Sequence, residues 1–253
     1  MSAMFVHSCN IILFSDSPNT GLLYSMSRHT LAFSLFLSTV GLGLGLHWEY
    51  LTFTQTWPMS FCNFTHCKKI PHPMDFTIHG LWPNPYIEAS KCNPAPEFDA
   101  KSLEPIKSEL SKYWPNFASP GSPSFWKYEY DKHGKCALED SLLSTELKYF
   151  NTSLVLRRKL DLKNKLATKG ITPSNTTIYE RDDFLGALKE ALKVSVKITC
   201  LKAKKQMAFI DEVRVCFNPA LEMIDCYDYE YGVENRVSTI HCPETFMFPS
   251  SPH

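Results

Sequence analysis

Two short segments of the sequence concentrate side chains that could transfer protons. The first, DFTIHGLWPN at residues 75–84, places one histidine, His79, at the end of a short apolar–polar alternation. The second, FWKYEYDKHGKC at residues 125–136, contains Glu129, Lys132 and His133. Because an imidazole titrates near pH ~6.5, it can accept and return a proton under neutral or mildly acidic conditions. Two imidazoles, a carboxylate and an ammonium therefore suit general acid–base catalysis.

The sequence offers no obvious Ser or Cys nucleophile beside these groups, which favours a substrate that carries its own nucleophile. RNA is such a substrate, because its ribose 2′-hydroxyl can attack the adjacent phosphorus. The protein then needs only a base, an acid and positive charge around the phosphorus, and no metal or other cofactor. Structural explanations remain as alternatives: a lone histidine such as His79 is usually a satisfied structural residue, and Glu129 with Lys132 alone would suit a solvated helix face.

The first segment is expected to form a strand. Phe76 and Ile78 alternate with Asp75, Thr77 and His79, so the two sets point to opposite faces and His79 turns away from the core side.

The second segment is expected to form a helix that ends at Gly134, directly after His133. At about 100° per residue, Trp126 and Tyr130 share an arc that suits the core. The neighbouring arc carries the acid, the ammonium, the imidazole and two aromatic rings: Phe125, Tyr128, Glu129, Lys132 and His133.

The rest of the chain alternates between strand-like and helix-like patterns without βαβ regularity. This order predicts an α+β domain with a central antiparallel β-sheet flanked by helices. Alternating apolar residues indicate strands at residues 50–58 and 209–217, and apolar residues at helical spacing indicate helices at residues 102–114, 153–170 and 181–193.

Length and charge narrow the class of protein further. The chain has 253 residues, 44% of them hydrophobic, which suits one globular domain with a substantial core. Lys plus Arg and Asp plus Glu both number 26, so the net charge is zero. A protein that bound polyanions through bulk electrostatics would be more basic, so an anionic substrate must be held by a local site.

The N-terminal part has the features of a secretory signal peptide. In the segment that begins at Met26, Arg28 and His29 precede an apolar run that ends in small residues. We expect an upstream extension or leader at residues 1–25, a signal peptide at 26–46 and the folded domain at 47–253. The apolar run is too short and too rich in glycine for a membrane span. These features predict a secreted or vacuolar protein without stable membrane association.

Cysteines and glycosylation sequons agree with export. Eight of the nine cysteines follow the signal peptide, and an even number in an exported chain indicates four disulfides. Zinc binding is the alternative, but the chain has no C-x2-C pair and its cysteine spacings are irregular. Sequons occur at Asn63, Asn151 and Asn175. The eight cysteines are Cys62, Cys67, Cys92, Cys136, Cys200, Cys216, Cys226 and Cys242.

FTIHGLWP and FWKYEYDKHGKC resemble the two active-site signatures of the ribonuclease T2 family, the secreted acid ribonucleases. The likeness extends from about Tyr50 to Cys242. It implies that His79 donates a proton to the leaving 5′-oxygen and that His133 takes the proton from the 2′-hydroxyl. It also implies that Glu129 and Lys132 stabilise the phosphorane, and that the enzyme cleaves single-stranded RNA, not DNA, as a monomer.

The resemblance also suggests substrate-binding residues. Phe125, Asn116 and Phe117 resemble positions that cradle a base, and Gln55 is a weaker candidate because the strand reads Gln-Thr-Trp-Pro where relatives often read Gln-Trp-Pro. Tyr128 stands where many members have a third histidine, so phosphate binding there would be weaker or would use a phenol.

The cysteine spacing resembles that of the plant members of the family. The resemblance also implies the family's fold, a central antiparallel sheet flanked by helices. Plant members act in self-incompatibility or as S-like ribonucleases of phosphate starvation and defence, and the sequence favours neither role. The remaining alternatives are a catalytically silent recognition or storage protein and an unrelated disulfide-rich binding module. The resemblance implies four pairings: Cys62–Cys67, Cys92–Cys136, Cys200–Cys242 and Cys216–Cys226.

Overall fold

A largely antiparallel sheet forms the centre of the structure, a computed structural model that describes residues 45–68, 74–203, 207–226 and 239–252. The expected leader and nearly all of the expected signal peptide lie outside these residues. The strand order is β2-β1-β5-β4-β7, and the α+β class predicted from the sequence is confirmed. The five strands are β1 (Tyr50–Thr56), β2 (Thr77–Asn84), β4 (Lys197–Leu201), β5 (Phe209–Phe217) and β7 (Thr239–His241).

Three short strands extend this sheet. β3 (Ile178–Glu180) pairs with β8 (Thr245–Met247), and β6 (Met223–Ile224) pairs with β5. β8 also meets β5 in parallel, the one exception to antiparallel pairing among the described strands.

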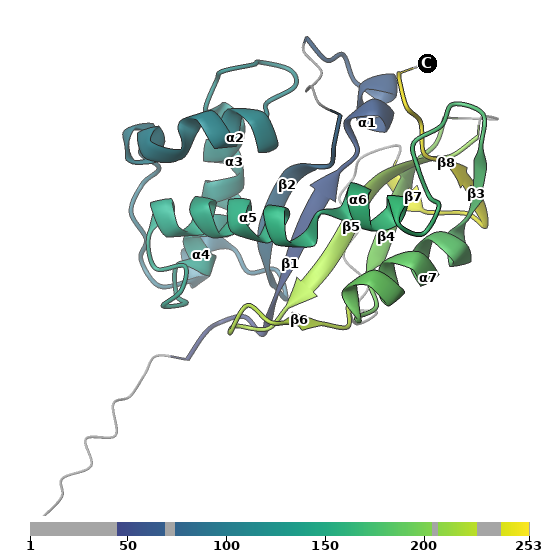
Figure 1. The fold of residues 1–253 in the computed structure, drawn as a ribbon. Helices are drawn as coiled ribbons and strands as arrows, with labels where there is room; N and C mark the ends of the chain where they lie inside the picture. Colours follow the sequence, from purple (N-terminus) through teal and green to yellow (C-terminus); the bar gives the residue numbers. More distant parts are fainter. Residues whose placement is uncertain (1–44, 69–73, 204–206, 227–238, 253) are drawn as a thin grey trace, which may run out of the picture. The chain divides into compact units, whose positions relative to one another are not determined.

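Helices cover the sheet and flank its β2 edge. α5 (Glu146–Leu160) and α6 (Leu162–Ala167) cross in front of the strands in Figure 1, and α7 (Arg181–Leu192) continues this layer. Phe53, Leu81 and Val215 lie side by side on neighbouring strands and are completely buried. The other helical segments are α1 (Pro58–Phe64), α2 (Lys107–Tyr113), α3 (Ser124–Glu129), α4 (Lys135–Ala137), the 3-10 helices Ala89–Lys91 and Ala100–Ile106, and a π-helical turn, Tyr130–Gly134.

The helix expected at residues 153–170 differs from the observed elements. α5 already begins at Glu146, because the side chain of Thr145 caps it by accepting a hydrogen bond from the backbone N–H of Lys148. It ends at Asp161, whose φ of 41° lies in the left-handed region, and α6 then starts as a separate helix. The expected single helix was therefore wrong, since periodicity alone did not reveal a one-residue break.

The helix expected at residues 102–114 is also divided. A 3-10 helix (Ala100–Ile106) precedes α2, and Pro105 lies inside it. Proline has no backbone N–H to donate to a helical hydrogen bond, so Pro105 interrupts the regular bonding of these first turns.

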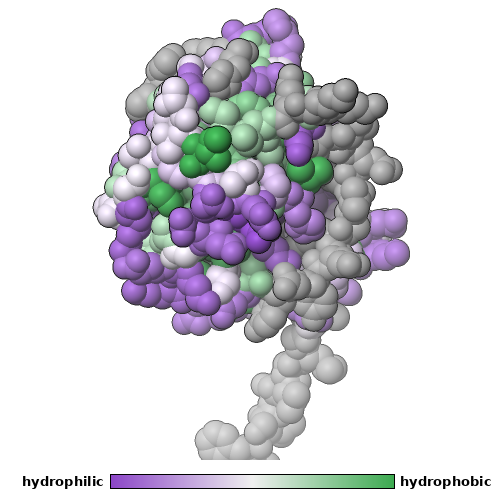
Figure 2. Space-filling model, turned by 90° about the vertical axis from the view of Figure 1, so that its right-hand side faces the viewer, coloured by the Kyte–Doolittle hydropathy of each residue, from purple (hydrophilic) through white to green (hydrophobic). Residues whose placement is uncertain are grey.

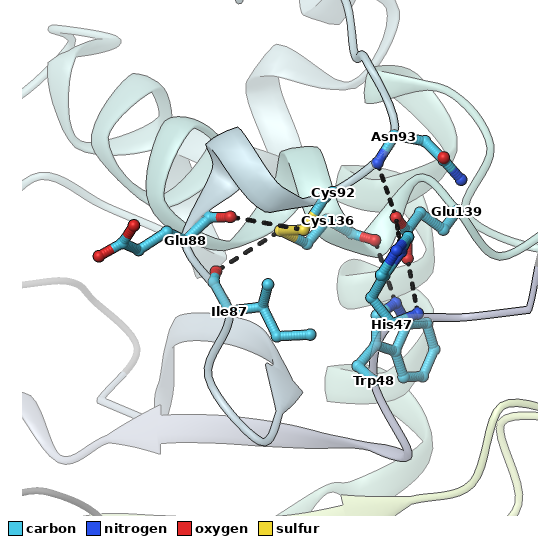
Figure 3. Close-up of a disulfide and its surroundings, with 8 residues drawn as sticks. All are labelled: His47, Trp48, Ile87, Glu88, Cys92, Asn93, Cys136 and Glu139. Atoms are coloured by element: carbon cyan, nitrogen blue, oxygen red, sulfur yellow. Dashed lines mark hydrogen bonds and ion pairs between the residues drawn. A yellow bond between two sulfur atoms is a disulfide. The ribbon is translucent and has the colours of Figure 1, made fainter.

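Four disulfides join the eight cysteines in the pairs that the family resemblance implies. Cys92–Cys136 ties the loop after β2 to α4, close to the N-terminal end of the described domain. Figure 3 shows Glu139 beside this bond, where it accepts hydrogen bonds from the backbone N–H groups of His47 and Asn93. The four pairs are Cys62–Cys67, Cys92–Cys136, Cys200–Cys242 and Cys216–Cys226.

Polar and apolar residues alternate on the part of the surface that Figure 2 shows. On the face shown in Figure 2, hydrophobic residues form small patches separated by hydrophilic ones. Among the described helices, none combines the length and the apolar character needed to cross a membrane.

Candidate active site

His79 occupies a β-bulge on the edge strand β2. Thr54 of β1 pairs with Gly80 and the next residue, Gln55, pairs with Ile78, so His79 is the extra residue between two paired neighbours. A bulge re-aims a side chain and increases the local twist of the strand. The sequence predicted that His79 would turn away from the apolar side, but simple alternation could not predict the bulge.

Gly80 leaves room for the groups that surround His79. A Cβ atom built at this position would lie 2.1 Å from Nε1 of Trp82 and 2.3 Å from Oε2 of Glu129. Both distances are far below van der Waals contact, and both atoms belong to one hydrogen bond, in which Trp82 Nε1 donates to Glu129 Oε2 over 2.8 Å. Glycine is therefore required by this close approach of a helix to the strand.

The imidazole of His79 lies between two carboxylates. Its Nδ1 is 2.5 Å from Oε1 of Glu212, and its Nε2 is 3.7 Å from Oε1 of Glu129. Because an ionised carboxylate only accepts hydrogen bonds, Nδ1 carries the proton that it shares with Glu212. The ionised carboxylate of Glu212 favours the charged imidazolium, and Glu129 does so in its ionised form, so His79 is suited to donate a proton.

Glu129 is held almost completely inside the protein, with 1% of its surface exposed. Burial raises the pKa of this carboxyl, while His79, the Trp82 hydrogen bond and Lys132 act in the opposite direction. Trp82 thus supports Glu129 from the strand, and its own ring is only 9% exposed. This hydrogen bond gives Trp82 a supporting role at the site.

Glu212, on the central strand β5, is a member of the site that sequence reasoning missed. Burial would raise its pKa, but Arg214 and His79 outweigh burial and hold the pKa well below its usual range. Arg214 Nη2 and Nε donate to Glu212 Oε2 over 2.7 and 3.1 Å. Positions 212 and 214 share one face of a strand, and this spacing could have indicated a paired charge but not its place beside His79.

His133 has the opposite electrostatic environment. Burial lowers its pKa to about 3, and the positive charges of Lys132 and His79 act in the same direction. Its ring lies 5.2 Å from that of Trp82 and 5.8 Å from that of Tyr86, centre to centre. Its Nδ1 is buried and makes no hydrogen bond within the described part of the chain. A charged ring would bury an unsatisfied N–H there, so His133 is suited to remain neutral and accept a proton.

Lys132 and Tyr128 form a pair at the rim of the site. Lys132 Nζ donates to the phenol oxygen of Tyr128 over 3.3 Å, and Tyr128 is about half exposed. This geometry places a positive charge next to a phenol where many family members have an imidazole.

The helical segment that carries these groups is not the single α-helix expected from the sequence. α3 stops at Glu129, a π-helical turn spans Tyr130–Gly134, and α4 follows. The expected end at Gly134 was wrong, because its φ of −61° and ψ of −41° are helical. A Cβ there would lie 2.8 Å from Cδ2 of Tyr130, so this glycine serves close packing. π-Helical turns are frequent at functional sites.

The expected base-binding residues are only partly gathered. The Phe125 ring lies 5.8 Å from that of His79, which places an aromatic face at the site. Asn116 contacts the start of α3, because its Nδ2 donates a hydrogen bond to Oγ of Ser124, the first residue of that helix, over 3.1 Å. Phe117 instead packs its ring against Phe61 at 5.5 Å.

The structure does not support the expected base contact by Gln55. This side chain is 1% exposed and shares its strand face with Phe53, between the paired residues Ile78 and Val213. The site groups lie on the opposite face, that of Thr54. Its position on the apolar face, away from these groups, does not favour a contact with a substrate base.

Comparisons with known proteins agree with this arrangement. The family model described as "Ribonuclease T2 family" matches residues 48–226. Ribonuclease T2 of Danio rerio is 36% identical over 184 residues, covering 71% of this chain and 73% of the relative. Ribonuclease Oy of Magallana gigas is 36% identical over 213 residues, covering 80% and 96%. The crystal structure of human RNase T2 superposes with a TM-score of 0.67 at 31% identity, covering 80% and 98%. The chain therefore belongs to the ribonuclease T2 family and is an endoribonuclease.

Proposed function

We propose that the enzyme cleaves single-stranded RNA by transphosphorylation, through a 2′,3′-cyclic phosphate that is then hydrolysed to a 3′-phosphate. The observation that carries this proposal is the contrast between the two imidazoles. His79 lies between the carboxylates of Glu129 and Glu212, whereas His133 is half-buried next to Lys132 and has a lowered pKa. One ring is thus prepared to give a proton and the other to take one.

In the first step, His133 removes the proton from the ribose 2′-hydroxyl. The 2′-oxygen forms a bond to phosphorus, and the bond from phosphorus to the 5′-oxygen breaks. His79 gives its Nε2 proton to that departing oxygen. DNA lacks the 2′-hydroxyl, so the same site cannot cleave it in this way.

Negative charge that develops on the phosphorane is met by Lys132 and by Glu129, which is buried and has a raised pKa. A carboxyl that is neutral part of the time can donate a hydrogen bond to a phosphoryl oxygen, whereas a carboxylate cannot. In the second step the roles reverse: His79 activates water, and His133 returns its proton to the 2′-oxygen.

Phe125 is proposed as the aromatic platform for a base, with Asn116 and Phe117 positioning its loop and Tyr128 beside the phosphate. Aromatic stacking accepts any base, so this platform favours unpaired RNA. Action as a monomer is proposed as well.

Secretion through the signal peptide at residues 26–46 is proposed as the route to an extracellular or vacuolar location, with residues 47–253 as the ribonuclease domain. Asn151 is the best candidate for glycosylation because it is exposed on α5. The amide of Asn175 already donates to Oγ of Ser251 over 2.6 Å, and Asn63 is partly buried. A role in general RNA catabolism is proposed over self-incompatibility, because the likeness extends to animal relatives.

Cleavage is expected to need no metal, because side chains supply the acid, the base and the positive charge. With a dinucleotide substrate, excess EDTA should leave kcat/KM unchanged, and chromatography of the products should show the 2′,3′-cyclic phosphate before the 3′-phosphate. An activity that EDTA removes and Zn²⁺ or Mg²⁺ restores, or a 3′-phosphate formed without the cyclic intermediate, would contradict the proposed mechanism.

Cleavage is also expected to persist at acidic pH. A base must be neutral, and the pKa of His133 is lowered to about 3, so its neutral form survives well below the ~6.5 of a free imidazole. The acid limb of the kcat/KM profile should therefore lie below pH ~5. Lys132→Met removes a positive neighbour and should move this limb to higher pH, besides lowering the rate. A wild-type limb near pH ~6.5 that does not respond to Lys132→Met would contradict this assignment of the base.

A further inference from the structure

The strand β5 contributes a buried charged pair to a site whose acid and base come from β2 and from the helical segment. Glu212 is 4% exposed, and both of its carboxylate oxygens are occupied. Oε1 lies 2.5 Å from His79 Nδ1, and Oε2 accepts the bonds from Arg214 Nε and Nη2. His79 and Arg214 therefore fix the orientation of the Glu212 carboxylate from its two oxygens.

The strand register explains why Glu212 can reach His79. Thr56 of β1 pairs with Glu212 on one side and with Thr77 of β2 on the other, and Thr54 likewise lies between Arg214 and Gly80. Glu212 and Arg214 therefore share the sheet face on which the bulge re-aims His79. The bulge makes His79 the unpaired residue of β2, and the charge pair on β5 lies on the face to which the bulge directs its ring.

Five charged or titratable groups face His79 from the elements packed around it. Glu212, with Arg214 behind it, approaches Nδ1 from β5, and Glu129 approaches Nε2 from α3. Lys132 and His133 lie on the π-helical turn. The guanidinium of Arg214 also lies 5.4 Å from the centre of the Trp82 ring, and Trp82 in turn holds Glu129.

We propose that Glu212 is a positioning residue for His79, and that Arg214 orients Glu212 in turn. Glu212 accepts the Nδ1 proton, which fixes the ring orientation and leaves the Nε2 proton directed toward the departing 5′-oxygen. Its negative charge also keeps the imidazole protonated before the reaction. This inference rests on the proposed function, in which His79 is the general acid, and it adds the group that prepares that acid.

The same arrangement explains how His79 can regain a proton after each cycle. When His79 has given its Nε2 proton away, the ring is neutral. The remaining proton stays on Nδ1, in the hydrogen bond to Glu212. Nε2 is then the basic atom and can take a proton from water in the hydrolytic step. Glu212 thus fixes one tautomer in both steps.

Glu212→Gln tests this proposal. Gln keeps the shape and an acceptor oxygen but removes the charge, so kcat/KM on RNA should fall about 10- to 100-fold, part of the total contribution of a general acid. Loss of the negative neighbour disfavours the imidazolium, so the alkaline limb of the RNA profile should move to lower pH by about one unit or more. Activity on a nucleoside 3′-(4-nitrophenyl phosphate) should stay within about threefold, because that leaving group needs no proton.

Glu146→Gln is the matched control, because Glu146 is another buried acid, 8% exposed, that is not part of the site. It should leave both substrates and the alkaline limb unchanged, and thermal melts of both variants should report any loss of fold. If Glu212→Gln does not fold, Glu212→Asp replaces it. Asp keeps the charge but shortens the reach, so RNA cleavage should fall while the alkaline limb stays near that of the wild type.

Equal losses on RNA and on the nitrophenyl ester, with an unmoved alkaline limb, would overturn the proposal and leave Glu212 with a structural role. Failure of the proposed function would look different, because His79→Ala itself would then lose equally on both substrates. Glu212→Gln thus tests the positioning role, and His79→Ala tests the proposed function separately.

Discussion

Gly80→Ala is expected to reduce RNA cleavage by about 100-fold or more. The added Cβ would lie 2.1 Å from Trp82 Nε1 and 2.3 Å from Glu129 Oε2, so the hydrogen bond between these two side chains cannot survive in its present place. Glu129 and the helix that carries it must then move relative to His79. Misplacement of a catalytic group by about 1 Å can cost about 100-fold in rate, which sets the expected magnitude.

The measurement is kcat/KM on RNA together with a thermal melt. Gly186→Ala is the matched control, because Gly186 lies in α7 and a Cβ there would meet nothing within 4 Å. Alanine in a helix is favoured over glycine by about 0.5–1 kcal/mol, so the control should be as stable as the wild type or slightly more stable, with full activity. A Gly80→Ala enzyme with wild-type kcat/KM would show that the strand and the helix need not approach so closely.

The proposed catalytic quartet is indicated by the sequence because two local motifs carry it. His79, Glu129, Lys132 and His133 lie within two short segments, and each segment has a periodicity that indicates which side chains share a face. The structure brings these segments together at the edge of β2. The burial of Trp126 and Tyr130 and the strand at 209–217 also follow from periodicity, and both predictions are confirmed.

Features that depend on contacts between distant segments could not be predicted in this way. The bulge at His79 is defined by pairing with β1, and Glu212 reaches His79 across an intervening strand. The π-helical turn is set by packing, where Gly134 meets the rings of Tyr130 and Tyr149. The bulge and the contact of Glu212 with His79 join residues that are far apart in the chain, so no short window of sequence contains their signal.

Gln55 illustrates a different source of error. The resemblance placed it near a base, but in β1 Thr56 stands between Gln55 and Trp57, where relatives often have Gln next to Trp. Because side chains alternate across a strand, positions 55 and 56 point to opposite faces. Gln55 consequently lies on the buried face with Phe53.

His79→Ala and His133→Ala are expected to respond differently to the leaving group. A ribose alkoxide is a poor leaving group that needs a proton, so His79→Ala should lose roughly 10²- to 10⁴-fold on RNA. A nitrophenolate leaves readily without one, so the same variant should keep most of its activity on a nucleoside 3′-(4-nitrophenyl phosphate). His133 removes the 2′-proton in both reactions, so His133→Ala should lose about 10²- to 10⁴-fold on both substrates.

The most direct measurement of this division of roles is the loss in kcat/KM of His79→Ala on RNA, divided by its loss on the nitrophenyl ester. The contrast between a histidine flanked by two carboxylates and a half-buried histidine beside Lys132 predicts a ratio of roughly 100 or more for His79→Ala. The same ratio for His133→Ala should be close to one. A ratio near one for His79→Ala would contradict the account and indicate that His79 binds phosphate as a cation, and a large ratio for His133→Ala instead would show that the two rings have exchanged roles.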